Sequence, residues 1–98
     1  MQFVQLIEFK TKRIDEFDAL MDEWMKVSEG WRGPTRSLRA KDRDRPDTYV
    51  QIVEFPSYET AMENSNRSET SEFSKRLAAL CDGPPSFTNL DVDREDVM

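Results

Sequence analysis

The chemistry open to this 98-residue chain is limited first by an absence, because the sequence contains no histidine. An imidazole is the usual general base near neutral pH, the usual partner of a catalytic serine, and a common ligand of haem and zinc. Its absence excludes many enzyme classes at once. Any acid–base chemistry must therefore come from carboxylates, lysine, tyrosine, the single cysteine or the substrate itself.

The single cysteine, Cys81, excludes an internal disulfide and is typical of a protein from a reducing cytoplasm, which is the location we expect. Cys81 falls on one apolar helical stripe with Phe73, Leu77 and Leu80. This placement favours a core thiol over a catalytic nucleophile.

Residues 42–47 (DRDRPD) begin like a calcium-binding loop. Asp47 stands where such a loop requires glycine, and no terminal glutamate follows at the right distance. We therefore predict a polar turn here, and no metal site.

The charge is unevenly distributed along the chain. From Arg32 to Arg45 there are six basic residues against two aspartates, beside Trp31, although the net charge is −6. Such a segment is a candidate nucleic-acid contact, but binding to phosphates is favoured by an extended positive field. We interpret the segment as a solvated strand and hairpin loop. We therefore expect no nucleic acid as partner. The sequence also shows no signal peptide and no membrane-spanning apolar run, so we expect no membrane partner either.

A strand that turns directly into a helix, residues 49–66, organises the rest of the chain. Residues 49–55 (YVQIVEF) are rich in β-branched and aromatic side chains, as in a largely buried strand. Pro56 removes a ladder donor and ends the strand. Ser57 is placed to cap the first turn of a helix, with Glu59 near the positive end of that helix.

Three further strands are predicted from alternating hydrophobicity, at residues 3–9, 35–41 and 86–92. The second of these is weakly apolar and suits an edge position. It should form a hairpin with the strand that follows the polar turn. Residues 93–98 form an acidic tail.

Two helices are predicted from apolar residues that recur at helical spacing. In the first helix, apolar residues recur from Ile14 to Val27, with Thr11 as the expected cap and an end near Gly30. The second begins with residues 58–64 and is interrupted near Asn66. Asn66 and Glu69 then have the spacing of a capping box for its second piece.

The element order predicts a single domain, residues 1–98, of the α+β class. Strand, helix, strand, strand, helix, strand is the ferredoxin-like βαββαβ arrangement, in which four antiparallel strands carry two helices on one face. Short connections and right-handed crossovers leave few alternatives.

The alternation within the strands separates two faces. We assign the smaller, aliphatic set to the helices, which leaves a bulky, partly polar set exposed. That patch would be too large and aromatic for a free surface, so we expect two sheets to pack face to face in a homodimer closed into an α/β barrel. Both faces are apolar, so a dimer is expected with either assignment. The aliphatic set is Val4, Leu6, Leu38, Ala40, Val50, Ile52, Leu90 and Val92, and the bulky set is Phe3, Gln5, Ile7, Phe9, Tyr49, Gln51, Val53, Phe55, Phe87 and Asn89.

Residues 54–61 (EFPSYETA), followed by a helix that bears Phe73, resemble the equivalent corner of the dimeric α/β-barrel superfamily. The resemblance is closest to small antibiotic-biosynthesis-monooxygenase-like proteins. The element order covers nearly the whole chain, but the local motif is short, and members often carry tryptophan where Phe55 stands. The resemblance implies a small-molecule enzyme that needs no cofactor, a monooxygenase of phenolic, quinol or polyketide-like aromatic substrates. Haem degradation is not expected, because that branch uses a histidine on the second helix and residues 73–80 contain none.

The catalytic candidates under this resemblance lie where the second helix meets the sheet. Asn64 would hydrogen-bond a substrate oxygen and Arg67 would stabilise a phenolate. Glu54 or Glu8 would act as base if burial raises its pKa. The alternatives are that Asn64 only breaks the helix and that Arg67 is a solvated surface residue.

The substrate-binding candidates lie on the sheet and on the first helix. Gln5, Tyr49 and Gln51 would orient the substrate, and Trp24 would pack against its ring. Alternatively, the two glutamines hydrogen-bond one another across neighbouring strands, and the two aromatic residues serve only in packing.

Two other functions stay open at this point. One is a non-catalytic ligand-binding or regulatory homodimer, and the other is a lyase or isomerase that uses the same pocket. An enclosed cavity with a buried carboxylate or an arginine beside Asn64 would favour catalysis. A filled apolar core would favour a binding or structural role.

Overall fold

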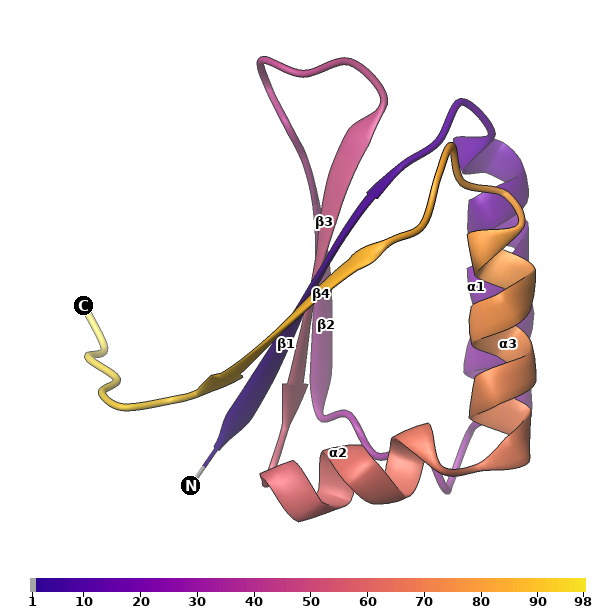
Figure 1. Ribbon diagram of the computed structural model, residues 1–98. Coiled ribbons are helices and arrows are strands. Elements are labelled where there is room, and N and C mark those ends of the chain that lie inside the picture. Colours follow the sequence, from indigo (N-terminus) through magenta and orange to yellow (C-terminus); the bar gives the residue numbers. More distant parts are fainter. Residues whose placement is uncertain (1) are drawn as a thin grey trace.

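The computed structural model describes residues 2–98 and shows one four-stranded sheet with helices on one side (Figure 1). Strands β1 (Phe3–Lys10), β2 (Arg36–Lys41), β3 (Thr48–Phe55) and β4 (Ser86–Asp91) lie in the order β2-β3-β1-β4. All neighbouring strands are antiparallel. The predicted α+β, ferredoxin-like fold is confirmed, and the strands begin and end within one residue of the predicted ranges.

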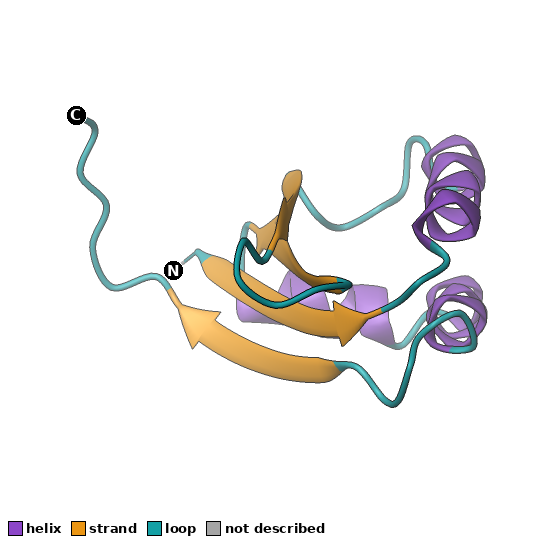
Figure 2. Cartoon of the chain, turned by 90° about the horizontal axis from the view of Figure 1, so that it is seen from above, coloured by secondary structure: helices purple, strands orange, loops and turns teal. Residues whose placement is uncertain are grey.

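The helical layer consists of α1 (Ile14–Val27), α2 (Tyr58–Ser65) and α3 (Ser68–Ala78). Helices α1 and α3 run side by side at some distance from the sheet, and α2 lies crosswise and leads from β3 to α3 (Figures 1 and 2). The predicted interruption near Asn66 occurs, but it separates two helices, because Arg67 has an extended backbone (φ −72°, ψ 135°). The predicted number of two helices is therefore too low by one.

The helix caps follow the prediction in one case of three. Ser57 Oγ accepts a hydrogen bond from the backbone N–H of Thr60 (3.1 Å), as expected for the cap of α2. Thr11 does not cap α1. Its hydroxyl instead donates to the carbonyl oxygen of Leu80 (2.7 Å) and so links the start of α1 to the segment after α3.

The predicted capping box at the start of α3 is also wrong. Asn66 is the last residue of α2's terminal turn, and Arg67 occupies the N-cap position of α3 without a side-chain hydrogen bond. The Glu69 carboxylate accepts from Ser68 Oγ (2.8 Å), and the backbone N–H of Asn66 donates to the carbonyl oxygen of Met62 (3.0 Å) instead of to Glu69. The chain runs one residue further than the pattern suggests before the new helix begins.

The assignment of the two strand faces was reversed. The bulky set faces the helices, and the aliphatic set faces away from them. Helices α1 and α3 stand too far from the sheet for small side chains to reach, whereas aromatic rings bridge the gap: the Phe9 and Phe17 rings stack at 4.5 Å and 5°. The buried hydrophobic residues are Phe3, Phe9, Phe17, Tyr49, Phe55 and Ala61.

The core is divided into two clusters that lie at opposite ends of β1. Phe3 packs with Phe55 of β3 and Ala61 of α2 at one end. Phe9 packs with Phe17 and Tyr49 at the other end. Ile7, between the two clusters on the helix-facing side of β1, belongs to neither.

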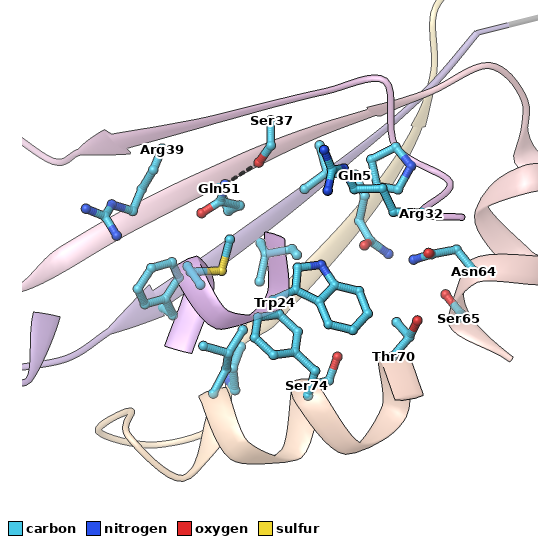
Figure 3. Close-up of a pocket in the computed structure, with 18 of the residues that line it drawn as sticks. Gln5, Trp24, Arg32, Ser37, Arg39, Gln51, Asn64, Ser65, Thr70 and Ser74 are labelled. Atoms are coloured by element: carbon cyan, nitrogen blue, oxygen red, sulfur yellow. Dashed lines mark hydrogen bonds between the residues drawn. The ribbon is translucent and has the colours of Figure 1, made fainter. Parts of the chain in front are cut away.

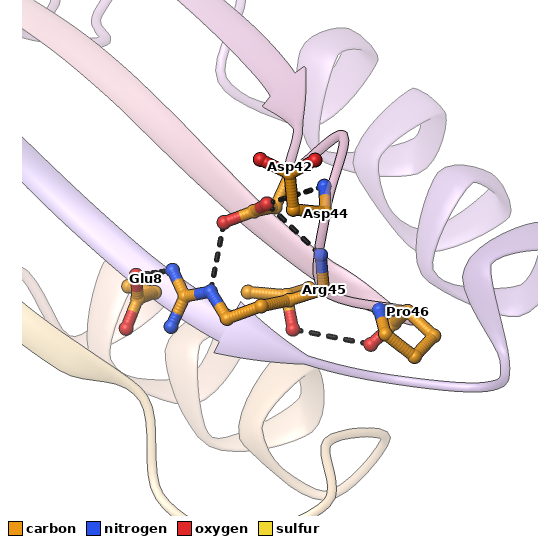
Figure 4. Close-up of polar contacts among 6 residues, drawn as sticks. Glu8, Asp42, Asp44, Arg45 and Pro46 are labelled. Carbon is orange, nitrogen blue, oxygen red and sulfur yellow. Dashed lines mark hydrogen bonds and ion pairs between the residues drawn. The ribbon is translucent and has the colours of Figure 1, made fainter.

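The hairpin loop between β2 and β3 is held by its own polar groups (Figure 4). The Asp42 carboxylate accepts hydrogen bonds from the backbone N–H groups of Asp44 (2.9 Å) and Arg45 (3.0 Å). It also accepts one from Arg45 Nε (2.8 Å), while Arg45 Nη2 donates to Glu8 (2.8 Å). These contacts make residues 42–47 a polar turn of fixed shape, as predicted.

Residues 2–98 contain no helix that is long and apolar enough to cross a membrane. Across the same residues, no three His, Cys, Asp or Glu side chains are grouped so that they could hold a metal ion.

Candidate functional site

A cavity of about 880 Å³ lies between the helix-facing side of the sheet and helices α1 and α3 (Figure 3). Gln5, Ile7, Gln51 and Val53 form its floor on the central strands. The cavity occupies the space between the two core clusters. It therefore exists because the clusters hold the helices away from the middle of the sheet.

The wall opposite the sheet is aromatic. The rings of Trp24 (α1) and Phe73 (α3) stack at 4.4 Å and 11°, and both line the cavity. Trp31 packs edge to face with Trp24 (5.5 Å, 89°). Trp24 thus serves both in packing and in lining the cavity, and its indole is held in one orientation.

Gln5 and Gln51 both point into the cavity from the sheet (Figure 3). They do not hydrogen-bond one another. Gln5 Nε2 donates to Asn89 Oδ1 on β4 (3.1 Å), and Gln51 Nε2 donates to Ser37 Oγ on β2. No other side chain among residues 2–98 donates a hydrogen bond to either side-chain carbonyl oxygen.

Asn64, near the end of α2, lines the cavity and directs its amide group into it (Figure 3). Its carbonyl oxygen accepts a hydrogen bond from the backbone N–H of Gly33 (3.4 Å). This contact fixes which end of the amide is available, so the NH₂ group is the end left for a ligand. Asn64 therefore does more than interrupt the helix.

Two predicted site residues lie outside the cavity. Tyr49 belongs to a core cluster, is only 8% exposed and stacks on Phe9 at 5.5 Å. The Arg67 guanidinium lies 3.9 Å from the centre of the Trp31 ring and 3.6 Å from Glu69. Tyr49 is drawn into the core because the bulky face packs on the helices. The Arg67 side chain is instead held by Trp31 and Glu69 at the junction of α2 and α3.

The two carboxylates proposed as a base lie on the opposite side of the sheet. Glu54 accepts from Gln2 (3.0 Å) and pairs with Arg36 (3.5 Å). Glu8 pairs with Arg45 at 2.8 Å. Both alternate with residues that line the cavity, so both point away from it.

Three residues at the Asn64 end of the cavity were not predicted. Arg32, Ser65 and Thr70 line this end, and Figure 3 shows them together with Asn64. Thr70 Oγ1 is buried and has no hydrogen-bond partner among residues 2–98. Helical spacing contains a signal for this residue, because it precedes cavity-lining Phe73 by three positions.

Cys81 lines the cavity at its other end and behaves as a neutral thiol. Its Sγ donates to the carbonyl oxygen of Leu77 (3.4 Å). Burial raises the pKa of the thiol, and the nearby Asp82 raises it further. A raised pKa disfavours the thiolate, so the expected role in the core is preferred to that of a nucleophile.

The antiparallel sheet order β2-β3-β1-β4 with helices on one face defines a ferredoxin-like fold. No known protein-family profile matches the chain, and no curated protein sequence is significantly similar to it. The solved structures establish the fold. SnoaB, a cofactor-independent oxygenase from Streptomyces nogalater, matches with a TM-score of 0.79 and 14% identity over 96% of this chain and 95% of its own.

Two further structures support the same fold. A protein from Caulobacter crescentus, assigned as an antibiotic biosynthesis monooxygenase, matches with a TM-score of 0.79 and 14% identity over 95% of this chain and 91% of its own. Rv0793 from Mycobacterium tuberculosis matches with a TM-score of 0.77 and 14% identity, and the match covers 99% of this chain and all of that one (100%). The superfamily resemblance is thus confirmed at the level of the fold.

Proposed function

We propose that this protein is a cofactor-independent monooxygenase that oxidises an electron-rich phenolic, quinol or polyketide-like aromatic compound in the cavity. The observation that carries the proposal is the arrangement of Trp24 and Asn64 in one cavity, with an aromatic wall beside an amide N–H donor. The fold of SnoaB supports it.

The size and lining of the cavity suit a planar polycyclic ligand. Pockets for small molecules measure about 300–1,000 Å³, and this cavity of about 880 Å³ lies near the upper end. A flat ring system would lie between the sheet floor and the stacked pair of Trp24 and Phe73. The carbonyl oxygens of Gln5 and Gln51 would meet hydroxyl groups on the opposite face of the ligand.

The proposed chemistry depends on the absence of a free base among the described residues that line the cavity. Asp18 is the only carboxylate there, and Arg39 holds it through its two terminal guanidinium nitrogens. No free carboxylate base is therefore present, and the substrate must ionise because its anion is stabilised. Donation from the Asn64 NH₂ group to the developing phenolate or enolate oxygen would do this.

The oxidation itself needs only oxygen and the ionised substrate. The carbanion passes electrons to O₂ and forms a carbon–oxygen bond at the reacting carbon. One oxygen atom becomes the new carbonyl, and the other leaves as water with the two hydrogens lost from that carbon. The substrate supplies all four electrons, and the protein orients the ring and excludes water.

Turnover of anthrone under ¹⁸O₂, without added metal or flavin, tests the proposal. We expect anthraquinone that carries one ¹⁸O atom, and a rate that falls about a hundredfold in Asn64→Ala, as for loss of an oxyanion donor. Asn66→Ala, two residues away and outside the cavity, serves as the matched control. No turnover above the uncatalysed rate with anthrones and naphthols alike would refute the oxygenase.

One observation favours the second candidate function, a non-catalytic ligand-binding or regulatory homodimer. The ion pair of Asp18 and Arg39 leaves the cavity without a free base. Under this alternative, aromatic ligands bind to the wild type and binding weakens in Asn64→Ala, but oxygen consumption does not rise above background. The same samples therefore separate the two functions.

We further propose that the protein is a homodimer whose sheets pack through the faces that point away from the helices. Leu38, Ile52 and Leu6 lie side by side across three strands on that face. Leu38 and Leu90 are 44% and 42% exposed in the single chain. An aliphatic surface spread over four strands is typical of a buried interface.

A further inference from the structure

Arg32 carries the one cationic group of the described cavity lining that no acidic side chain neutralises. Three arginines and one aspartate line the cavity. Arg39 is paired with Asp18, and Arg36 is paired with Glu54. Within residues 2–98, no carboxylate lies within ion-pair distance of Arg32. The protein as a whole has a net charge of −6, so the Arg32 end of the cavity is locally positive in a protein that is negative overall.

The guanidinium of Arg32 is held in place by neutral groups. Its Nη1 donates to the carbonyl oxygen of Met25 (3.0 Å), near the end of α1, and to Ser28 Oγ (3.4 Å). Ser28 is fully buried and donates in turn to the carbonyl oxygen of Trp24 (2.6 Å). The position of the charged group is thus set by the end of α1.

These contacts occupy one nitrogen and leave one edge of the guanidinium available. Nε and Nη2 have no hydrogen-bond partner among the described residues. These two nitrogens present parallel N–H groups, which match the two oxygens of a carboxylate in a bidentate pair. A phenolate has a single oxygen and cannot place one oxygen opposite each nitrogen.

The surrounding groups complete a polar end of the cavity. Arg32 precedes Gly33, whose N–H fixes the Asn64 amide. Thr70 Oγ1 lies at the same end, is buried and has no partner in residues 2–98. Figure 3 shows Arg32, Gln5 and Asn64 directed toward this end, beside the edge of the Trp24 ring.

We propose that Arg32 is a specificity-determining residue and that the ligand is an aromatic carboxylic acid. Its carboxylate binds the free edge of the Arg32 guanidinium, and its ring system lies along Trp24. Thr70 Oγ1 donates to a second ligand oxygen near the same end. The inference rests on the proposed function in taking the cavity as the site of an aromatic ligand, and it adds the charged group that the ligand must carry.

A pair of probes of equal shape tests the inference without requiring turnover. Anthracene-2-carboxylate and anthracene-2-carboxamide are titrated into the wild type by calorimetry. We expect the carboxylate to bind about tenfold more tightly at low salt, as for a charge-assisted bidentate pair. This advantage should shrink as salt is raised, whereas carboxamide binding should change little.

Variants assign the difference to Arg32. Arg32→Gln should bind both probes alike, at an affinity close to that of the wild type for the carboxamide. Arg32→Lys keeps the charge but loses the pair of parallel N–H donors, and it should retain part of the preference for the carboxylate. Arg43→Gln makes the same charge change on the exposed hairpin and should keep the full preference.

The outcomes separate this inference from the proposed function. Equal affinity of the two probes for the wild type would overturn the carboxylate site and leave the oxygenase intact. A preference for the carboxylate that survives in Arg32→Gln, with its thermal transition unchanged, would also overturn it. If neither probe bound, the aromatic-binding cavity itself would be refuted, and the proposed function with it.

Discussion

The backbone N–H of Gly33 donates to the side-chain carbonyl oxygen of Asn64 over 3.4 Å, and this contact joins the loop after α1 to the end of α2. The approach is close: a Cβ on Gly33 would lie 3.2 Å from the Cβ of Asn64. Two segments that are distant in the sequence thus meet at the polar end of the cavity. The orientation of Asn64 depends on the absence of a side chain at Gly33.

Gly33→Ala should therefore displace Asn64 and lower the turnover of anthrone by about ten- to a hundredfold, since small displacements of a catalytic group have effects of this size. The free energy of unfolding should fall by about 1–3 kcal/mol through overpacking. Gly30→Ala is the matched control. No atom lies within 4 Å of its added Cβ, but φ is +90°, so it should lose stability without losing turnover. Equal turnover in the two variants would contradict the role of Gly33.

The stack of Trp24 on Phe73 should contribute to the binding of aromatic ligands. In Phe73→Leu the indole loses its stacking partner, and we expect anthracene-2-carboxamide to bind about three- to tenfold more weakly, as for the loss of one aromatic pair. Tyr58→Leu removes a comparable contact, the edge-on pair with Phe3 at 5.5 Å, outside the cavity. Calorimetric titration should show no change of affinity in this control, and a loss there as large as in Phe73→Leu would refute the assignment.

The hairpin should make folding stability depend on pH through Asp42. Hydrogen bonds from the backbone N–H of Asp44 and from Arg45 lower the pKa of this carboxyl below its ordinary value. A lowered pKa in the folded state adds stability at pH values above the ordinary aspartate pKa of about 3.9, and this stability is lost as the pH falls through the lower folded value.

Urea midpoints measured at pH 5 and at successively lower pH test this dependence. In Asp42→Asn, the drop in stability below about pH 4 should be smaller than in the wild type. Asp44→Asn removes the same charge from the same loop but keeps the Asp42 contacts, and its drop should match that of the wild type. If Asp42→Asn kept the full drop, the contribution would lie elsewhere.

Native mass spectrometry tests the proposed dimer directly, because the main species should have twice the mass of the chain. Leu38→Glu places a charge on the aliphatic face and should shift the population to monomer. Val27→Glu makes the same change at an exposed position on α1 and should leave the dimer intact. A wild type that stays monomeric at micromolar concentration would refute the interface.

Features that depend on a few neighbouring residues were predictable from the sequence. The strand at Thr48–Phe55, the stop at Pro56 and the Ser57 cap all follow from local backbone chemistry. The order of the elements then left few topologies to consider, so the fold followed as well.

Features that depend on packing across the chain were not predictable. Alternation separates two strand faces but does not say which face meets the helices when both are apolar. That choice decided that Tyr49 is buried in a cluster while Gln5 and Gln51 line the cavity. Likewise, which arginine enters the cavity, Arg32 or Arg67, depends on how two loops meet.

The division of the core into two clusters at opposite ends of β1 has a consequence for how this protein can evolve. The contacts of Phe3 with Phe55 and of Phe9 with Phe17 and Tyr49 lie in those clusters, and Gln5 and Gln51 at the middle of the sheet line the cavity between them. Substitutions at these two glutamines therefore remove little of the packing that keeps the chain above its folding threshold. A lineage with this architecture is free to adopt new substrates one substitution at a time while its scaffold persists.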